Sequence, residues 1–375
     1  MKVVILAQIP EVNNKYTFSL ARGLKQAGVD IVVCGIDSDD VSAYHDIRHV
    51  PLFHAYSNIS NPIKKILSYN QSWKRVLQYC INNNVNILHV QWYIFSPLDY
   101  LYIRRAQRNN IKVVATIHDL LPFNKKFYDF YFHKKIYQKA NWVISQARDN
   151  MDKLIKSFGV NPDKLSYIPH GHYMDFAENA TREESRKYLK LPLDKKIILF
   201  FGQIKKVKGV DILVEAMKEI HKKHPEALCL IAGKVWKDDF SKYEQQIRAD
   251  DLTDCFRTDI KFIPDDQIKY YFNAADIVAL PYKKIYQSGV VLLAYAYEKP
   301  VVATREGEFL TVVKDKETGL LVPSNDAKAF AKALCWYLDH PDTALEFGKR
   351  GKQDLYVRLS WTTIGASIAD IYRRL

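Results

Sequence analysis

The chain has 375 residues, 48% of them apolar, and its 55 basic and 42 acidic residues give a formal net charge of +13. This length and apolar content suffice for two buried cores, and no apolar run reaches the ~20 residues that span a membrane. The first ten residues, MKVVILAQIP, hold only a short strand and lack the long apolar region of a signal peptide, so we expect a cytoplasmic protein. The five cysteines form no CxxC pair, which indicates neither a zinc site nor a disulfide framework.

Strands and helices are expected to alternate along the whole chain, which favours two α/β domains with parallel sheets. Apolar runs in the first half predict strands at 3–6, 31–34, 87–90, 113–117 and 142–144. Apolar runs in the second half predict strands at 197–201, 228–231, 260–263, 277–280 and 301–303. The polar segment 173–195 lies between the two halves, and we expect it to be a linker with a short helix at 183–189.

The segment 196–211, KIILFFGQIKKVKGVD, has the sequence of an anion site. A buried strand runs into Gly202, which lets the backbone turn sharply, and Lys208 lies just before an amphipathic helix. The N-terminus of a helix offers free N–H groups and a partial positive charge, and the lysine adds a full charge, so a phosphate is the expected ligand. The alternative is an ordinary βα turn with a solvated lysine cluster.

A second segment, 276–304, repeats this order of strand, turn and helix. Pro281 ends the strand, a polar loop carries Gln287, Ser288 and Gly289, and an apolar helix follows. Ser288 can cap that helix and Gly289 allows close approach, which makes a second set of backbone N–H groups available to a phosphate. Two such sites in one sheet suit a diphosphate.

These and other short motifs, in order along nearly the whole chain, resemble the nucleotide-sugar glycosyltransferases of the GT-B type, in particular the retaining family 4. The motifs are TIHD at 116–119, VIS at 143–145, IPHG at 168–171, GQIKKVKG at 202–209, IAG at 231–233, AADIVALPY at 274–282 and TGLLVP at 318–323. The resemblance implies an α/β fold of two Rossmann-like, doubly wound domains that face a central cleft. Residues 1–168 would bind the acceptor, 169–355 the nucleotide-sugar donor, and 356–375 would form a helix that packs back on the first domain.

The resemblance assigns the donor diphosphate to the turn in the second domain. Lys208 is expected to act in catalysis by binding the leaving diphosphate, beside Gly202 of the same turn. The arginine that follows this glycine in the family is replaced here by Gln203, an uncharged residue. Lys205 or Lys206 then has to supply the missing charge.

A second departure from the family concerns two glutamates, whose positions hold Ile285 and Leu293 here. A polysaccharide-assembly branch of the family carries QSG before an apolar helix instead, and this chain resembles that branch. The expected phosphate and sugar contacts are the three residues of this motif, Gln287, Ser288 and Gly289. Relatives touch the nucleobase at a place that holds Pro264 and Asp265 in this chain.

The first domain is expected to supply the acceptor side. His118 follows a predicted strand, which places it at the carboxyl edge of the sheet, where open α/β sheets bind ligands. The family histidine at this place lies beside the transferred sugar, whereas the alternative is a capped or solvated histidine. His170 and His172 either take part at the cleft or form a hinge turn with exposed imidazoles. Asn13 and Asn14 begin the first helix, where relatives have glycines near the acceptor.

No carboxylate is clearly placed as a nucleophile, which disfavours a covalent intermediate. The resemblance implies attack on the face from which the diphosphate leaves, with retention of configuration, and the diphosphate accepts the proton of the acceptor. The protein then supplies electrostatic positioning, and neither a metal nor another cofactor is expected. The segment Asp37-Ser38-Asp39 looks like a metal-binding DxD motif, but it follows a strand of the first domain and is interpreted as a loop.

The positive charge is concentrated in segments that also carry aromatic residues. Residues 124–142, NKKFYDFYFHKKIYQKANW, mix lysines with aromatic side chains, and 61–75 with Arg104, Arg105 and Arg108 extend the basic face. Aromatic rings settle at the headgroup level and each lysine gains about 1 kcal/mol from anionic lipid, so we expect peripheral binding to the inner face of the membrane. The alternative is a helix that packs its aromatic residues into the domain and solvates its lysines.

The sequence therefore predicts an enzyme, a metal-independent glycosyltransferase. It would move a hexose-type sugar from a UDP- or GDP-sugar to a saccharide or a polyprenyl-diphosphate-linked acceptor in surface polysaccharide or glycolipid synthesis. One alternative is a GT-B enzyme that hydrolyses or epimerises the nucleotide sugar. The other is a non-enzymatic protein that binds nucleic acid or an anionic polymer. The two phosphate turns and the lack of an RRM, KH or helix-turn-helix signature disfavour this second alternative, so no nucleic-acid partner is expected.

Overall fold

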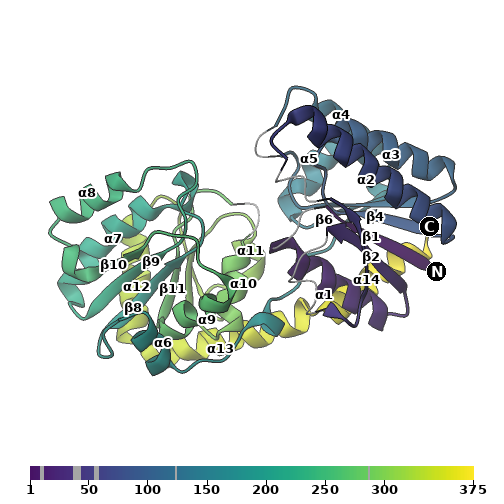
Figure 1. Cartoon of the computed structure of the whole chain (residues 1–375). Helices are drawn as coiled ribbons and strands as arrows, with labels where there is room; N and C mark the ends of the chain where they lie inside the picture. The colour runs from purple at the N-terminus through teal and green to yellow at the C-terminus, as the bar shows by residue number, and fades with distance from the viewer. Residues whose placement is uncertain (9–11, 37–43, 55–58, 123–124, 286–287) are drawn as a thin grey trace. The chain divides into compact units, whose positions relative to one another are not determined.

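The computed structural model describes residues 1–8, 12–36, 44–54, 59–122, 125–285 and 288–375, except for the side chains of residues 12 and 13. The chain divides into two compact units, one made of Met1–Gly171 with Leu359–Leu375 and the other of His172–Arg358. These boundaries fall a few residues after those expected from the sequence. Each unit is built around one parallel sheet with helices on its faces (Figure 1), which confirms the predicted α/β class.

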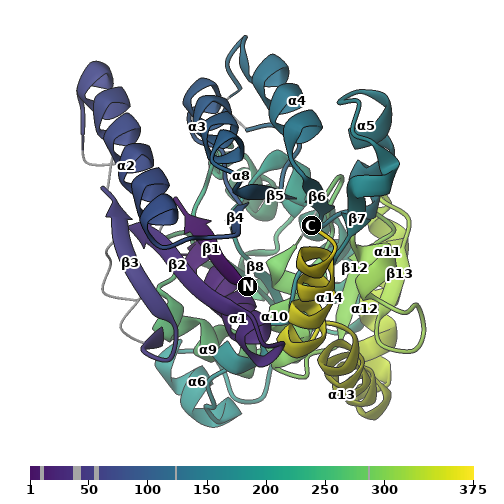
Figure 2. The same ribbon diagram turned by 90° about the vertical axis from the view of Figure 1, so that its right-hand side faces the viewer.

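The first unit has a seven-stranded parallel sheet in the order β3-β2-β1-β4-β5-β6-β7. Its strands are β1 (Lys2–Ala7), β2 (Asp30–Ile36), β3 (Arg48–Phe53), β4 (Ile87–Val90), β5 (Lys112–Ile117), β6 (Trp142–Ser145) and β7 (Leu165–Tyr167). Its helices are α1 (Val12–Gln26), α2 (Pro62–Asn82), α3 (Ser96–Arg108), α4 (Asp129–Lys139), α5 (Met151–Lys156) and α14 (Trp361–Arg373). Figure 2 shows α2, α3 and α4 in a row over one face of this sheet, and α1 with α14 against the other.

Alternation along the strands gives this sheet two buried faces. On one face, Leu6 of β1 shares a core with Trp73 of α2 and Tyr102 of α3, whose rings stack with centroids 5.5 Å apart. On the other face, α14 lies so close to α1 that a Cβ atom on Gly365 would come within 2.2 Å of the α1 backbone. His89 of β4 also joins this helix, because its Nδ1 lies 2.6 Å from the hydroxyl of Tyr372. The last helix is therefore a structural part of the first unit.

The second unit has a six-stranded parallel sheet in the order β10-β9-β8-β11-β12-β13. Its strands are β8 (Lys196–Phe201), β9 (Ala227–Ala232), β10 (Phe256–Asp259), β11 (Ile277–Leu280), β12 (Val301–Thr304) and β13 (Leu320–Val322). Its helices are α6 (Arg182–Tyr188), α7 (Val210–Lys223), α8 (Ser241–Ala249), α9 (Asp265–Ala274), α10 (Gly289–Ala296), α11 (Phe309–Val312), α12 (Ala327–Asp339) and α13 (Pro341–Arg358). In this unit α7 packs against α12, α6 against α9 and α10 against α13.

The predicted strand at 260–263 is wrong. The strand is β10, which starts at Phe256 opposite Cys229 of β9 and ends at Asp259. Its sequence FRTD is mostly polar, because an edge strand has only one neighbour and needs no continuous apolar run. The apolar run that follows it leaves the sheet, and Phe262 is 65% exposed.

The segment 173–195 is not a linker but a folded part of the second unit. A capping box between Thr181 and Glu184 starts α6. Arg186 of α6 is fully buried and donates to the carboxylate of Asp276 at 2.7 Å. This ion pair ties the helix to the start of β11, and the predicted short helix at 183–189 is confirmed within α6.

The structure also describes the cysteines, the lengths of the helices and the grouping of possible metal ligands. All five cysteines are buried free thiols, in agreement with the absence of a disulfide framework. In the part of the chain that the structure describes, no helix is long and apolar enough to cross a bilayer. No group of three or more His, Cys, Asp or Glu residues in the same part is arranged to hold a metal ion. The DxD-like segment Asp37-Ser38-Asp39 lies outside the described residues.

Candidate functional site

Each sheet has one point at which its strand order reverses. In the first unit β1 lies between β2 and β4, and in the second unit β8 lies between β9 and β11. Ligands of open α/β sheets bind outside the carboxyl ends of the strands at such a switch point. Lys208 follows β8 and Ser288 follows β11, so both belong to the switch point of the second unit.

The turn after β8 is in backbone contact with the loop after β11. Gly202 and Gly209 both have positive φ, 110° and 71°. A Cβ atom on Gly209 would lie 1.9 Å from the carbonyl oxygen of Pro281, so no larger residue fits there. The N–H of Lys283 also donates to the carbonyl of Val207 at 2.8 Å. The start of α7 is thus fixed by the neighbouring loop.

Lys208 is the cation that this turn presents. Its Nζ lies 3.7 Å from the centroid of the Tyr282 ring, which is a cation–π contact. Burial lowers the pKa of Lys208 to about 7, and no carboxylate among the described residues opposes this effect. Binding of an anion would restore the charged form, because a nearby negative charge favours an ammonium group. Lys208 is therefore not a fully solvated lysine, which was the alternative for this position.

The other residues predicted in this turn differ in exposure. Gln203 and Lys206 are exposed. The Nζ of Lys205 lies 4.4 Å from the centroid of the Trp236 ring, and Lys237 contacts the same ring at 4.7 Å. Lys205 is therefore held by an aromatic ring of the loop after β9, whereas Lys206 extends to solvent.

The structure corrects the role expected of Ser288. Ser288 directly precedes α10, but its side chain makes no capping hydrogen bond. Its backbone N–H donates to Oε2 of Glu308 at 2.7 Å, so this amide is not open to a phosphate as the sequence suggested. At Gly289 the ring of Tyr173 comes close, since a Cβ atom there would lie 3.2 Å from it. Gln287, the first residue of the motif, lies outside the described residues.

A buried polar group connects Lys208 with Glu308. Burial raises the pKa of Tyr282, whose ring contacts Lys208, and the neighbouring hydroxyl of Ser288 lowers it. Glu308 is 9% exposed, and burial raises its pKa to about 7 against the opposing effect of the Ser288 N–H. Glu308 was not among the residues predicted from the sequence. Its place in the loop after β12, the strand next to β11, is the signal that could have found it.

Pro264 and Asp265, predicted near the nucleobase, stand at the start of α9. Pro264 directly precedes the helix and Asp265 is exposed in its first turn. Burial raises the pKa of Tyr173, and the charges of Glu308 and Asp265 raise it further. Both carboxylates therefore lie near Tyr173, which places Asp265 in the same region as the start of α10.

His118 follows β5 and is enclosed by aromatic rings. Its ring stacks on Trp92 with centroids 4.0 Å apart and an interplanar angle of 4°, and Tyr16 approaches edge-on at 4.9 Å. Burial and the neighbouring His170 lower the pKa of His118 to about 3, so the ring is neutral near pH 7. Its Nε2 is buried without a hydrogen-bond partner among the described residues. The alternative of a solvated histidine is therefore wrong for His118.

The two other histidines of the predicted site belong to different units. His170 lies 4.8 Å from Tyr16 and 5.8 Å from Trp361, and burial lowers its pKa to about 4. His172 is 4% exposed and stacks on Tyr356 of α13 with ring centroids 5.8 Å apart. The predicted exposure of these imidazoles is therefore wrong, although the segment does lie at the boundary between the two units.

Further polar residues lie at the switch point of the first unit. Asn14 is buried in α1, whereas the side chain of Asn13 lies outside what the structure describes. The hydroxyl of Thr17 in the same helix donates to the side-chain oxygen Oε1 of Gln91 at 2.8 Å. The Gln91 amide nitrogen and the Trp92 indole nitrogen are buried without a partner in the described part of the chain. Gln91 and Trp92 were not predicted from the sequence, although both directly follow β4, the neighbour of β1.

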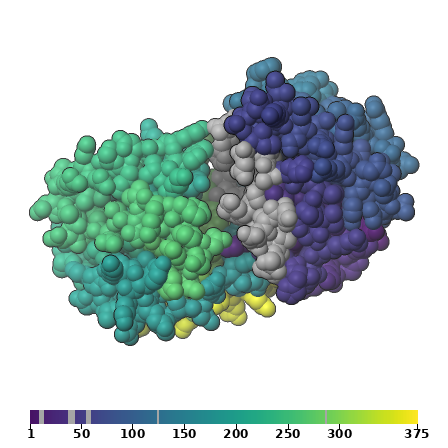
Figure 3. Space-filling view, in the orientation of Figure 1, coloured from purple at the N-terminus to yellow at the C-terminus, as the bar shows by residue number. Residues whose placement is uncertain are grey.

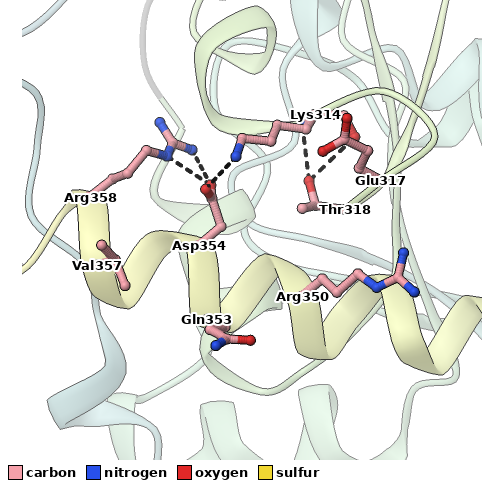
Figure 4. Close-up of a pocket in the computed structure, with 8 residues that line it drawn as sticks. All are labelled: Lys314, Glu317, Thr318, Arg350, Gln353, Asp354, Val357 and Arg358. Carbon is pink, nitrogen blue, oxygen red and sulfur yellow. Dashed lines mark hydrogen bonds and ion pairs between the residues drawn. The ribbon is translucent and has the colours of Figure 1, made fainter.

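A cavity of about 470 Å³ lies between α13 and the loop before β13 (Figure 4). In its wall, Asp354 pairs with Lys314 at 2.8 Å and with Arg358. Lys314 also donates its backbone N–H to Thr318 at 2.9 Å. The loop precedes β13, which places the cavity at the opposite end of that strand from the edge of Lys208. This cavity is therefore separate from the candidate site.

Comparisons with known proteins agree with the two-unit architecture. The model for "Glycosyltransferase Family 4" matches residues 14–175, and the model for "Glycosyl transferases group 1" matches residues 181–354. D-inositol 3-phosphate glycosyltransferase 2 of Catenulispora acidiphila is 26% identical over 247 residues, which cover 64% of this chain and 57% of that protein. The match thus spans less than two thirds of the length of this relative.

Solved structures share the fold over the whole chain. Anabaena Alr3699/HepE in complex with UDP has a TM-score of 0.78 and 16% identity, with all of both chains covered. A glycosyltransferase from Rickettsia africae has a TM-score of 0.74 and 20% identity, with 100% of this chain and 98% of that chain covered. Because two family models follow one another along the chain and the fold is shared throughout, this chain belongs to the glycosyltransferases of the GT-B fold, and its likeness to family 4 is consistent with that membership.

Proposed function

We propose that the chain transfers a hexose-type sugar from a UDP- or GDP-sugar to a saccharide or lipid-linked acceptor, with retention of configuration and without a metal ion. The observation that carries this proposal is Lys208, a half-buried cation at the switch point of the second sheet that no described carboxylate neutralises. A diphosphate would supply the missing counter-charge. The structure of Anabaena Alr3699/HepE is a complex with UDP, which makes UDP the first nucleotide to test.

The second unit offers positive charge to a leaving diphosphate. Lys208 precedes Gly209, which is the residue before α7, and no described side chain caps the start of this helix. The amide groups of the first helical turn and the ammonium group of Lys208 therefore belong to one short segment. Both interact more strongly with the diphosphate as negative charge develops on it, which lowers the barrier to its departure. Fixed positive charge of this kind replaces the cation of metal-dependent transferases, so the proposal includes no metal.

In the first unit, His118 is proposed to contact the transferred sugar. Its ring is fixed between Trp92 and Tyr16, and its neutral Nε2 can exchange one hydrogen bond with a hydroxyl group. A group with a pKa of about 3 is a poor general base near pH 7. This supports a mechanism in which the leaving diphosphate accepts the proton of the acceptor. Asn14 and His170 are the further candidates on the acceptor side.

The finer proposal on location is peripheral binding to an anionic membrane, with a polyprenyl-diphosphate-linked acceptor. Apolar side chains are exposed in the first turns of α2, where Ile63 is 69% and Leu67 61% exposed. They are also exposed around the start of α4, where Phe127 is 97% and Tyr131 58% exposed. Figure 3 shows α2, in dark blue, at the surface of the first unit. Helices that connect parallel strands run against them, so both helix starts lie at the carboxyl edge of the sheet, where His118 also lies.

The exposed apolar and basic surface at the starts of α2 and α4 is smaller than the sequence suggested. Trp73 and Tyr137, two aromatic residues of the basic segments, are at most 1% exposed and belong to the core. The remaining exposed residues still combine apolar groups with charge, since Lys64 and Lys126 are exposed beside them. Rings at the headgroup level and lysines near anionic lipid support weak, reversible membrane binding.

Calorimetric binding of UDP and GDP tests the donor site, with Lys208→Ala as the probe. Lys223→Ala is the control, because Lys223 is exposed in the last turn of α7, at the far end of this helix from Lys208. We expect one nucleotide to bind the wild type and the Lys223 variant with equal affinity, and Lys208→Ala to weaken this binding about tenfold or more. Absence of binding to the wild type would overturn the donor site. Release of free sugar or of an isomerised donor without acceptor would indicate hydrolysis or epimerisation instead of transfer.

A further inference from the structure

The carboxylate of Glu308 is buried at the candidate donor site, and no described residue supplies a counter-charge. Glu308 directly precedes α11 and is 9% exposed. Its Oε2 accepts the backbone N–H of Ser288 at 2.7 Å, which is the only hydrogen bond that described residues give this carboxylate. No described lysine, arginine or histidine pairs with it, and burial raises its pKa to about 7. Burial of an uncompensated carboxylate is unfavourable, so its presence at this place requires an explanation.

The neighbours of Glu308 also have unused hydrogen-bonding capacity. A carboxylate has roughly four acceptor positions, and Ser288 uses one of them. The Ser288 hydroxyl and the Tyr282 phenol lie next to each other, both buried, and neither has a hydrogen-bond partner of ordinary geometry within the described residues. Three adjacent polar groups are therefore incompletely satisfied, which is the arrangement expected of a site for a ligand rich in hydroxyl groups.

Tyr282 separates Lys208 and Glu308, the two groups of this site that have no ion-pair partner among the described residues. Lys208 lies 3.7 Å from the centroid of its ring, whereas Glu308 is reached from its phenol side through Ser288. The cation and the carboxylate therefore do not neutralise each other. A nucleotide sugar has the matching distribution of groups, because its diphosphate is anionic and its sugar carries neutral hydroxyl donors.

We propose that Glu308 binds the sugar part of the donor, with its carboxylate accepting a hydrogen bond from a sugar hydroxyl beside Ser288 and Tyr282. This proposal rests on the proposed function. The diphosphate is excluded as the partner of Glu308, because two anions repel each other.

The test compares Glu308→Gln with the wild type by calorimetry, using UDP and UDP-glucose or GDP and GDP-mannose, whichever pair the wild type binds. Glutamine keeps the shape of the side chain and can still accept the Ser288 N–H. Glu306→Gln is the matched control, because the Glu306 carboxylate accepts the Ser324 hydroxyl at 2.6 Å and does not contact Ser288. We expect Glu308→Gln to leave nucleoside diphosphate binding within about twofold and to weaken nucleotide-sugar binding about tenfold or more.

Three outcomes would overturn the proposal while the wild type still binds nucleotide. Equal weakening of the nucleoside diphosphate and the nucleotide sugar would show a general effect on the site. Stronger binding of both by Glu308→Gln would show that the carboxylate occupies a phosphate position. Unchanged binding of both would leave Glu308 a purely structural role. If Glu308→Gln does not fold, Glu308→Asp, which keeps the charge but shortens the side chain, is expected to show the same selective loss. A wild type that binds neither nucleotide would overturn the proposed function itself.

Discussion

The two switch points of this protein use opposite electrostatics. In the second unit, Lys208 and Glu308 are charged groups without a described counter-charge, kept apart by the Tyr282 side chain. In the first unit, burial keeps His118 and His170 neutral within a group of aromatic rings. The charged groups of the second unit suit a donor with an anionic diphosphate, whereas the neutral rings of the first unit suit an uncharged saccharide bound through shape and single hydrogen bonds. Substitutions in the two units should therefore have separable effects.

The largest expected effect is on turnover and distinguishes the two units most directly. Calorimetry first identifies the donor that binds. Lys208→Ala should lower the turnover of this donor about 10²–10³-fold, because the change removes the positive charge that stabilises the leaving diphosphate. His118→Ala should lower turnover as well, but with nucleotide affinity unchanged. Steady-state rates and calorimetric affinities of both variants check this. Loss of nucleotide affinity in His118→Ala as large as that in Lys208→Ala would contradict the division between the units.

The neutral histidine also predicts a dependence of stability on pH. The pKa of His118 is about 3 in the folded protein against an ordinary value of 6.5, so the unfolded chain binds more protons between these values. Stability is then lost as the pH falls below 6.5, by about 2 kcal/mol at pH 5. Burial also lowers the pKa of His89 to about 3 and that of His170 to about 4, so both proteins lose stability between pH 7 and pH 5. Denaturant unfolding should show a loss that is about 2 kcal/mol larger in the wild type than in His118→Asn.

A comparison of two proteins at each pH is needed because other groups titrate in the same range. Burial raises the pKa of the Asp99 carboxyl to about 7, which adds stability as the pH falls and opposes the histidine effect. Asp99 is present in both proteins, so the difference between them reports His118. An equal loss of stability in wild type and His118→Asn would contradict the burial of a neutral imidazole.

The charged switch point predicts the reverse dependence on pH for ligand binding. Lys208 has a pKa of about 7 when free, and a bound diphosphate favours its protonated form. Binding should therefore take up a proton above pH 7, and affinity should fall up to about tenfold per pH unit there. Calorimetry in two buffers with different ionisation enthalpies measures the uptake.

Arginine at position 208 provides the matched control, because its guanidinium stays protonated. Lys208→Arg should bind the nucleotide without this proton uptake. Glu308 also titrates near pH 7, so the same measurement on Glu308→Gln separates the two groups. Proton uptake that persists in Lys208→Arg and disappears in Glu308→Gln would assign the linkage to the carboxylate instead.

Sequence patterns predicted the strands that are buried on both faces. The run 197–201 is apolar throughout because neighbours cover β8 on both sides. Three strands near sheet edges were missed. β3 contains Pro51, which cannot donate to a ladder and is tolerated at an edge, and β7 and β13 are too short for a periodic signal. The strand placed at 260–263 failed for the related reason that β10 has a polar sequence.

The candidate site could be predicted only where one segment contains the whole signal. Lys208 and His118 each follow a strand directly, and that position is visible in the sequence. The hydrogen bond between Ser288 and Glu308 joins the loops after β11 and β12, and the stack of Trp92 on His118 joins the loops after β4 and β5. Such contacts depend on the register between adjacent strands, which decides which residues of their loops meet. No short sequence pattern specifies this register.

The smallest expected effect concerns the exposed residues of the first unit. Phe127 is 97% and Tyr131 58% exposed near the start of α4, and exchange of both for serine removes rings that could enter the headgroup layer. We expect sedimentation with phosphatidylglycerol-containing vesicles to weaken about fivefold, or about 1 kcal/mol. Phe262→Ser is the matched control in the second unit, where Phe262 is 65% exposed. Equal weakening by both changes would mean that exposed aromatic residues bind vesicles without regard to position, and the membrane surface would then not belong to the first unit.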